Sequence, residues 1–325
     1  MGRKRFQNRI AESRFSLTVT ILLCLPAWII CGMQALGFFA GGDHATGFNV
    51  VAGGAAALLS TYLMVELNNT NALIRIYSRM VSCCFLIMMT LHTFLYWNMD
   101  TALTTLGVTV FLYTIFHSYQ HKQAAGWVYY AFCGLSVASI AFIQIAYFLP
   151  LLWIMMFSRL LSMSIRTFSA SLLGILTPYW FFSVIKVWQG NIDCLANHFR
   201  DIATFSQPFD TSMLGIHELV SGTFILLCAF IGTIHYIRTR HQDRIKTQML
   251  YEMMITFNSA AITFLILQPQ HYNQLIGIIV VCTSTLIAHF IALTHTYWTN
   301  LLTKILLVAT IAITIFNLCR PSLNF

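Results

Sequence analysis

The chain has 325 residues, of which 58% are hydrophobic and only 9% are charged, and its formal net charge is +8. Two soluble domains, the usual content of this length, need far more charged surface, so a soluble enzyme is excluded. Because a bilayer-spanning helix takes roughly 20 apolar residues, the composition predicts an all-α, polytopic membrane protein with little mass outside the bilayer.

Eleven apolar runs are predicted as spans of one transmembrane helical bundle that occupies residues 1–325 as a single domain. The run 149–165 is short and contains Pro150 and Arg159, so residues 125–165 cross either twice or once, which gives eleven spans or ten. The first run is too long for a cleavable signal peptide, and we expect it to be retained. The runs are 15–40, 49–66, 79–97, 101–118, 125–147, 149–165, 168–187, 214–236, 248–268, 274–292 and 300–319.

The distribution of basic residues predicts the orientation, because Lys and Arg concentrate in cytoplasmic loops. With a cytoplasmic N-terminus at 1–14, 15 of the 18 basic residues fall inside, and only Lys186, Arg200 and Arg320 fall outside. A single crossing of 125–165 would move the basic loop 238–246 outside, so the charges favour eleven spans with the C-terminus out, in a bacterial inner membrane. Anionic lipid headgroups account for the basic balance, and no nucleic-acid partner is indicated.

The longest segment between spans is 188–213, which this topology places on the outer side. Its apolar residues recur at helical spacing, which predicts an amphipathic helix from Asp193 to Phe205 lying on the membrane surface. They are Ile192, Leu195, Ala196, Phe199, Ile202 and Phe205.

The same segment contains the candidate site residues. Asp193 and His198 are candidate catalytic proton-transfer groups, and Arg200 is a candidate phosphate contact. Asp43 and His44 of the first outer loop are candidate substrate-binding residues on the opposite wall of an outer vestibule. The alternative is that all of these are solvated loop residues beside an interfacial helix.

Six histidines lie near the expected inner ends of spans, and His117 and His121 are four residues apart, a spacing that can place two metal ligands on one helix face. Membrane desaturases and hydroxylases resemble this, but they need several paired-histidine boxes. We therefore expect these side chains to line the headgroup zone, and neither a metal nor a cofactor is predicted. The six are His117, His121, His235, His241, His289 and His295.

The interior of the bundle is predicted to be almost free of ionisable groups, which argues against a proton pump. Glu218, Glu252 and Lys304 lie near predicted span ends, where their side chains can reach water. The small residues from Gly53 to Ala57 are expected to allow close helix packing. Seven cysteines within apolar runs are expected to be buried thiols, namely Cys24, Cys31, Cys83, Cys84, Cys133, Cys228 and Cys282.

Two stretches carry a family resemblance. One is VELNNTN at 65–71, an asparagine-rich inner loop after the second span, and the other runs from Ala146 to Phe182. The second stretch has an aromatic-Pro turn, an arginine-containing inner loop and a Leu-Leu-Gly then Pro-Tyr pattern at 172–179. These features resemble an uncharacterised family of polytopic inner-membrane proteins of Bacteroidota. The resemblance implies a membrane bundle but no reaction, so it assigns no catalytic residue.

The layout of many short spans and one longer outer loop with His and Arg is similar to that of lipid-linked oligosaccharide polymerases and ligases and of polyprenyl-phosphate-sugar glycosyltransferases. The short first outer loop, GGDHATGFN, departs from those enzymes. We expect an inner-membrane protein of the cell envelope whose biochemical role stays open. The alternatives are an outer-face glycosyltransferase or polymerase with a polyprenyl-phosphate-linked substrate, a small-molecule transporter, and a non-catalytic subunit. Membrane lipid is the expected partner, and no protein partner is indicated.

Overall fold

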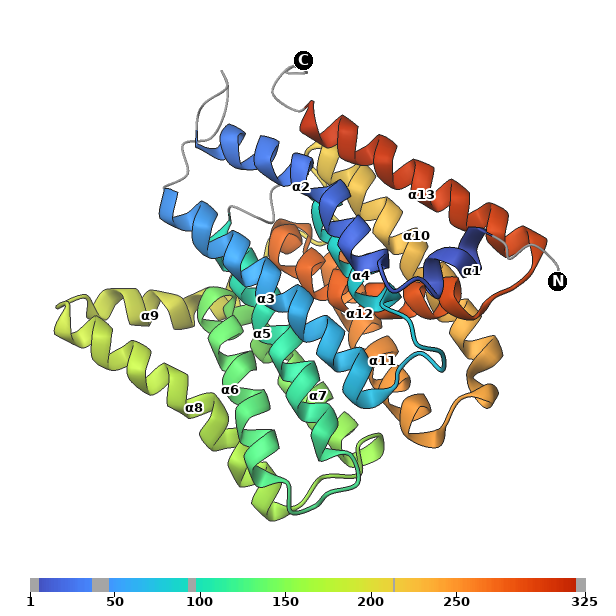
Figure 1. The fold of residues 1–325 in the computed structure, drawn as a ribbon. Coiled ribbons are helices and arrows are strands. Elements are labelled where there is room, and N and C mark those ends of the chain that lie inside the picture. The colour runs from blue at the N-terminus through green and yellow to red at the C-terminus, as the bar shows by residue number, and fades with distance from the viewer. Residues whose placement is uncertain (1–5, 37–46, 93–97, 213, 320–325) are drawn as a thin grey trace.

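The computed structural model describes residues 6–36, 47–92, 98–212 and 214–319, and within these ranges the regular structure is entirely helical (Figure 1). The α-helices are α1 (Phe6–Ala11), α2 (Ser16–Ala35), α3 (Gly47–Asn71), α4 (Met80–Leu91), α5 (Met99–Ile115), α6 (Ala125–Ala141), α7 (Leu149–Ser158), α8 (Ile165–Trp188), α9 (Ile192–Arg200), α10 (Ile216–Thr239), α11 (Ile245–Leu267), α12 (Tyr272–Leu293) and α13 (Tyr297–Leu318). Short 3-10 turns include η3 (Ile143–Phe148), η4 (Asp201–Ala203) and η5 (Arg240–Gln242).

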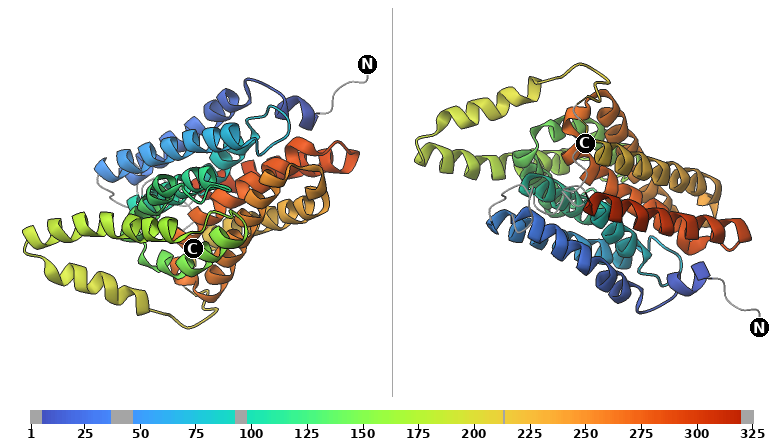
Figure 2. Two further views of the ribbon diagram at one scale, coloured as in Figure 1. Left: turned by 90° about the horizontal axis from the view of Figure 1, so that it is seen from below. Right: turned by 90° about the horizontal axis from the view of Figure 1, so that it is seen from above.

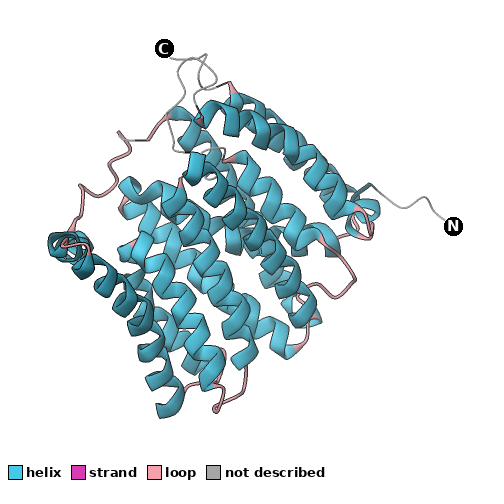
Figure 3. Ribbon diagram, turned by 60° about the vertical axis from the view of Figure 1, so that its left-hand side comes forward, coloured by secondary structure: helices cyan, strands magenta, loops and turns pink. Residues whose placement is uncertain are grey.

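Each of the eleven apolar runs contains a helix, and the helices lie side by side with their connections at the two ends (Figure 3). Among the described residues, eight helices are long and apolar enough to cross a membrane. The other three apolar segments, Met80–Leu91, Ala125–Ala141 and Ile143–Ser158, are shorter. The helical membrane bundle is therefore supported, and the number of full crossings stays a prediction.

Residues 125–165 leave one end of the bundle and return to it. Gln120 N donates to Leu160 O at 2.8 Å, and Ser164 Oγ donates to Lys122 O at 2.8 Å. The chain therefore ends this excursion beside its own start, as two antiparallel passes require. Pro150 lies in the first turn of α7, where its missing N–H breaks no helical hydrogen bond.

The helix α12 forms the centre of the bundle and is almost completely buried, whereas α2, α8 and α13 are mostly exposed. It packs against α10, α11, α4 and α5. Large apolar side chains on the peripheral helices, such as Trp180, Leu23 and Val308, are more than half exposed. Exposing so much apolar surface to water is unfavourable, and contact with lipid accounts for it. Six of the seven cysteines of the apolar runs are buried, and Cys133 is partly exposed.

Several close helix contacts occur at glycines for which the sequence did not predict close packing. A Cβ atom on Gly107 of α5 would lie 2.6 Å from Ala138 Cβ and 2.6 Å from Gly134 O of α6. Gly232 fixes the approach of α10 to α12 in the same way. Gly54, in contrast, has nothing within 4 Å, although Ala57 nearby is buried. The expected close packing at 53–57 therefore does not involve Gly54.

The helices α8 and α9 project from the bundle as a hairpin (Figure 1, left; Figure 2). The predicted helix from Asp193 to Phe205 is present but shorter, because α9 ends at Arg200 and η4 ends at Ala203. The reason is that side chains of η3 bind the carbonyl groups that a longer helix would use. Gln144 donates to Asp201 O at 2.9 Å, and Tyr147 donates to Ile202 O.

Candidate functional site

The predicted outer residues lie on two opposite faces of α9. At about 100° per residue, Asp193 and Arg200 share one face, and His198 lies on the other. Asp193 and Arg200 are exposed, and neither side chain has a hydrogen bond or ion pair among the described residues. The structure therefore does not bring Asp193 and His198 together. Asp43 and His44 lie outside the described residues.

His198 packs against α8. Its Nε2 lies 3.4 Å from Tyr179 Oη, and its ring centroid is 5.8 Å from that of Phe182. Tyr179 Oη is also 2.6 Å from Ser139 Oγ of α6. Burial in this contact lowers the pKa of His198, and the Asp201 carboxylate partly offsets that effect. The geometry gives His198 a role in holding α9 on α8.

Of the two histidines spaced four apart, His117 is held by its own helix and by a neighbouring ring. His117 Nδ1 lies 2.8 Å from Tyr113 O, and its ring stacks on Trp127 with a centroid distance of 4.4 Å. No group of three or more His, Cys, Asp or Glu side chains suited to a metal ion occurs among the described residues.

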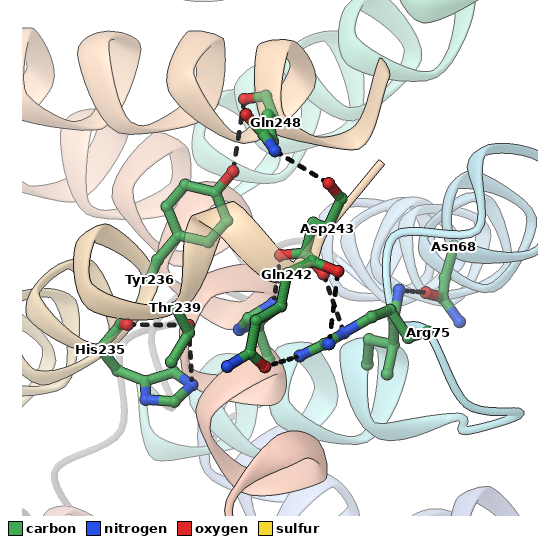
Figure 4. A network of polar contacts seen from close by, with 10 residues as sticks. Asn68, Arg75, His235, Tyr236, Thr239, Gln242, Asp243 and Gln248 are labelled. Atoms are coloured by element: carbon green, nitrogen blue, oxygen red, sulfur yellow. Dashed lines mark hydrogen bonds and ion pairs between the residues drawn. The ribbon is translucent and has the colours of Figure 1, made fainter. Parts of the chain in front are cut away.

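The most constrained polar site joins three residues that the sequence did not single out as a set. Asp243 lies between η5 and α11, and its side chain is completely buried. Its Oδ1 lies 2.9 Å from Arg75 Nε, and its Oδ2 lies 3.1 Å from His289 Nε2 of α12. Arg75 also donates to Gln242 Oε1 at 3.1 Å. Figure 4 shows Arg75 and Gln242 beside Asp243.

Aromatic rings enclose His289. Its ring centroid is 5.1 Å from that of Tyr251, 5.4 Å from that of Tyr236 and 5.4 Å from that of His235. His289 Nδ1 and Tyr251 Oη are both buried and have no hydrogen-bond partner among the residues that the structure describes. Charged and polar atoms thus meet at a place from which the side chains of α10, α11 and α12 exclude water.

Side chains close in sequence to Arg75 and Asp243 fix the loop and the turn that carry these two residues. Asn68 accepts a hydrogen bond from Ile74 N at 3.3 Å and donates to Ser78 O at 2.9 Å, which folds the loop that carries Arg75. The stretch 65–71 was expected to be a loop, but it forms the last turns of α3. From this helix end, the Asn68 side chain makes its hydrogen bonds to the loop that follows. Gln248 donates to Asp243 O at 2.8 Å and fixes the turn before α11.

A second ionic group lies at the same end of the bundle. Glu252 of α11 pairs with Arg240 of η5 at 3.1 Å and with Arg159, which follows α7. Glu252 was expected to lie near a span end and reach water. Its side chain is 18% exposed, and the structure also gives it two cationic partners. One signal could have suggested both groups: Asp243 and Glu252 are the acids nearest to the basic loop 238–246.

A change in the charge of Arg75, Asp243 or His289 would disturb the contacts of this site. A buried ion pair contributes little net stability, yet removing one partner leaves a charge in a low-dielectric interior. Arg75, Asp243 and His289, which we call the ionic triad, come from three separate elements, so any change in its charge acts on all three. Comparison of the chain with protein-family models, curated proteins and solved structures finds no match.

Proposed function

We propose that this chain is a multi-pass protein of the bacterial inner membrane that passes a small polar solute across the bilayer, with the ionic triad as its cytoplasmic gate. The apolar helices support membrane insertion. The excess of basic residues at 1–14 and in the loops on the same side supports a cytoplasmic N-terminus. Arg75 and Asp243 belong to two of those loops.

The observation that carries the proposal is the completely buried Asp243–His289 pair. Burying a carboxylate costs several kcal/mol of desolvation, so a buried pair adds little net stability. In some proteins such pairs instead specify one conformation or act as a switch. Together with Arg75, this pair connects the loop after α3, the turn before α11 and the central helix α12. Opening these contacts would release the end of α12 from its neighbours.

Further buried polar groups lie along α12, on two sides of the helix: at about 100° per residue, Thr285 shares the face of His289, whereas Thr283 and Tyr272 lie roughly 100–120° away. Thr285 is one helical turn from His289, Thr283 accepts from Asn258 at 3.2 Å, and Tyr272 Oη lies 3.0 Å from His92 Nε2. From Tyr272 to His289 the helix rises about 26 Å, most of the thickness of a bilayer core. These groups offer hydrogen-bonding partners to a polar solute at depths where lipid offers none.

The test uses native Cys282, which is completely buried on the same face of α12 as Thr285 and His289. Purified protein in lipid nanodiscs is treated with a charged, water-soluble methanethiosulfonate, and peptide mass spectrometry locates the label. If the triad is a gate, Asp243→Asn should raise the labelling rate of Cys282 about tenfold or more by breaking the pair. Asp193→Asn, the same substitution at an exposed position, is the control.

Buried Cys84 of α4 separates gate opening from general loosening. Opening predicts faster labelling of Cys282 with little change at Cys84. Unchanged labelling of Cys282 in Asp243→Asn, or an equal rise at both cysteines, would refute the gate.

A transferase that acts on a polyprenyl-linked sugar at the outer face is the second candidate. The exposed face of α9 that carries Asp193 and Arg200 favours this candidate. Arg200 has no partner among the described residues, so its N–H groups can donate to a phosphate. Binding of a polyprenyl phosphate to purified wild type should weaken in Arg200→Lys, which lacks the planar fork, and weaken further in Arg200→Ala. Equal binding by all three proteins would remove this candidate.

A further inference from the structure

Glu252 is the shared partner of two arginines from different elements. Its Oε1 lies 3.1 Å from Arg240 Nη1, and its Oε2 pairs with Arg159 Nη1. One carboxylate neutralises one guanidinium, so this group of three carries an excess positive charge. This excess positive charge distinguishes the Glu252 group from the ionic triad. The triad contains one arginine, Arg75, and its carboxylate, that of Asp243, is completely buried.

Both arginines retain donors that the protein does not use. A guanidinium has five N–H groups, and the described residues provide neither side chain with an acceptor other than Glu252. The side chains of Arg159 and Arg240 are 42% and 56% exposed, whereas that of Glu252 is 18% exposed. The positive charge and the free donors therefore face the surroundings, and the carboxylate lies beneath them.

Exposed apolar side chains flank the two arginines. On α7, Ile154 and Phe157 are exposed just before Arg159, and on α10 Ile237 is exposed three residues before Arg240. The site thus combines two cationic side chains with apolar surface on the helices that precede them, α7 and α10. A free phosphate ion would use only the first of these features, but a phospholipid uses both.

We infer that Arg159 and Arg240 bind the phosphate of an anionic phospholipid, whose acyl chains lie along Ile154, Phe157 and Ile237. Arginine suits this ligand because its planar fork matches two phosphate oxygens. Each arginine can then share its N–H groups between the headgroup and Glu252.

The experiment measures lipid binding to the purified full-length protein by native mass spectrometry. Phosphatidylglycerol is compared with phosphatidylcholine of the same acyl chains, and inorganic phosphate is added as competitor. The double variant Arg159→Gln with Arg240→Gln should lose about tenfold in affinity for phosphatidylglycerol and keep its affinity for phosphatidylcholine. Arg166→Gln, which also removes an exposed positive charge, is the control and should bind as wild type does.

The Glu252→Gln substitution should change the affinity for phosphatidylglycerol in the opposite direction. Removing the carboxylate leaves two arginines without their shared anion, so affinity for phosphatidylglycerol should rise about threefold. A purely structural ion group predicts no such gain. Unchanged binding in the double variant, an equal loss in Arg166→Gln, or a loss in Glu252→Gln would overturn the inference. Displacement of the lipid by millimolar inorganic phosphate would assign the site to the phosphate ion alone and overturn its lipid part.

Discussion

His289 Nε2 lies 3.1 Å from Asp243 Oδ2, although the two residues are 46 positions apart in the chain and both side chains are completely buried. The contact fixes the end of the central helix α12 to the turn between η5 and α11. Arg75 then ties the loop after α3 to the same carboxylate. Three segments with no local reason to meet are held by one buried charge.

Arg75→Gln should destabilise the protein, because Asp243 would keep His289 as its only ionic partner in a buried site. Since the Arg75 side chain is 35% exposed, we expect a loss of about 1–3 kcal/mol, below that for a fully buried pair. The free energy of unfolding is measured by denaturant titration in mixed micelles. Arg166→Gln, at an exposed position, should change it by less than about 0.5 kcal/mol. Equal effects would show that Arg75 does not act through Asp243.

Gly107→Ala should also destabilise the bundle. The added Cβ would lie 2.6 Å from the backbone oxygen of Gly134, so α5 and α6 would have to move apart, at an expected cost of about 1–3 kcal/mol. Gly54→Ala is the matched control, because nothing lies within 4 Å of its Cβ position. That variant should be neutral or more stable by up to about 1 kcal/mol, since Ala is the better helix former. Similar thermal unfolding of the two variants would contradict the assigned helix contact.

The docking of α9 on α8 should weaken in acid. The contact with Tyr179 and Phe182 lowers the pKa of His198 below the ordinary value of about 6.5. As the pH falls through 6.5, undocked His198 takes up a proton before docked His198 does, so protons favour the undocked form. A spin label at Asn197 should become more mobile as the pH falls below about 6.5. In His198→Phe that pH dependence should vanish, and an unaltered profile would exclude His198 as its source.

The eleven-span topology predicts the side of each loop. Reporter fusions at Lys122, Arg166 and Arg240 should all report the cytoplasm, and a fusion at Asn197 should report the outer side, because basic residues are retained inside. A cytoplasmic signal at Lys122 combined with outer signals at Arg166 and Arg240 would mean that residues 125–165 cross once.

If α9 lies on the membrane surface, as the sequence predicts, its residues should meet alternating environments. Spin labels from Ile192 to Ala203 should alternate between lipid and water contact with a period near 3.6 residues. Beyond Ala203 the period should stop, because the described helix and its 3-10 turn end there. Water exposure at every position would place α9 away from the membrane surface.

Much of the fold could be predicted from the sequence, because the length of an apolar run is a local property. All eleven runs contain helices, and the spacing of Leu195 and Phe199 predicted α9. The charge pattern also predicted that Lys122 would lie on the same side as Arg159 and Arg166, and the Gln120–Leu160 hydrogen bond brings these two stretches of chain together. Among the described outer site residues, the period of α9 places Asp193 and Arg200 on one face and separates His198 from both.

Only the tertiary structure decided which polar residues meet. Charge counts place Arg75 and Asp243 on the same side of the membrane, but they do not say that one pairs with the other or that His289 joins them. That choice depends on how α10, α11 and α12 pack, and it is visible at Gly232, where a Cβ would lie 2.8 Å from Leu286 Cβ. Hydropathy reports the preference of each segment for lipid over water. Pairing between segments depends on shape and on the cost of leaving a buried charge alone, and both are properties of the assembled bundle.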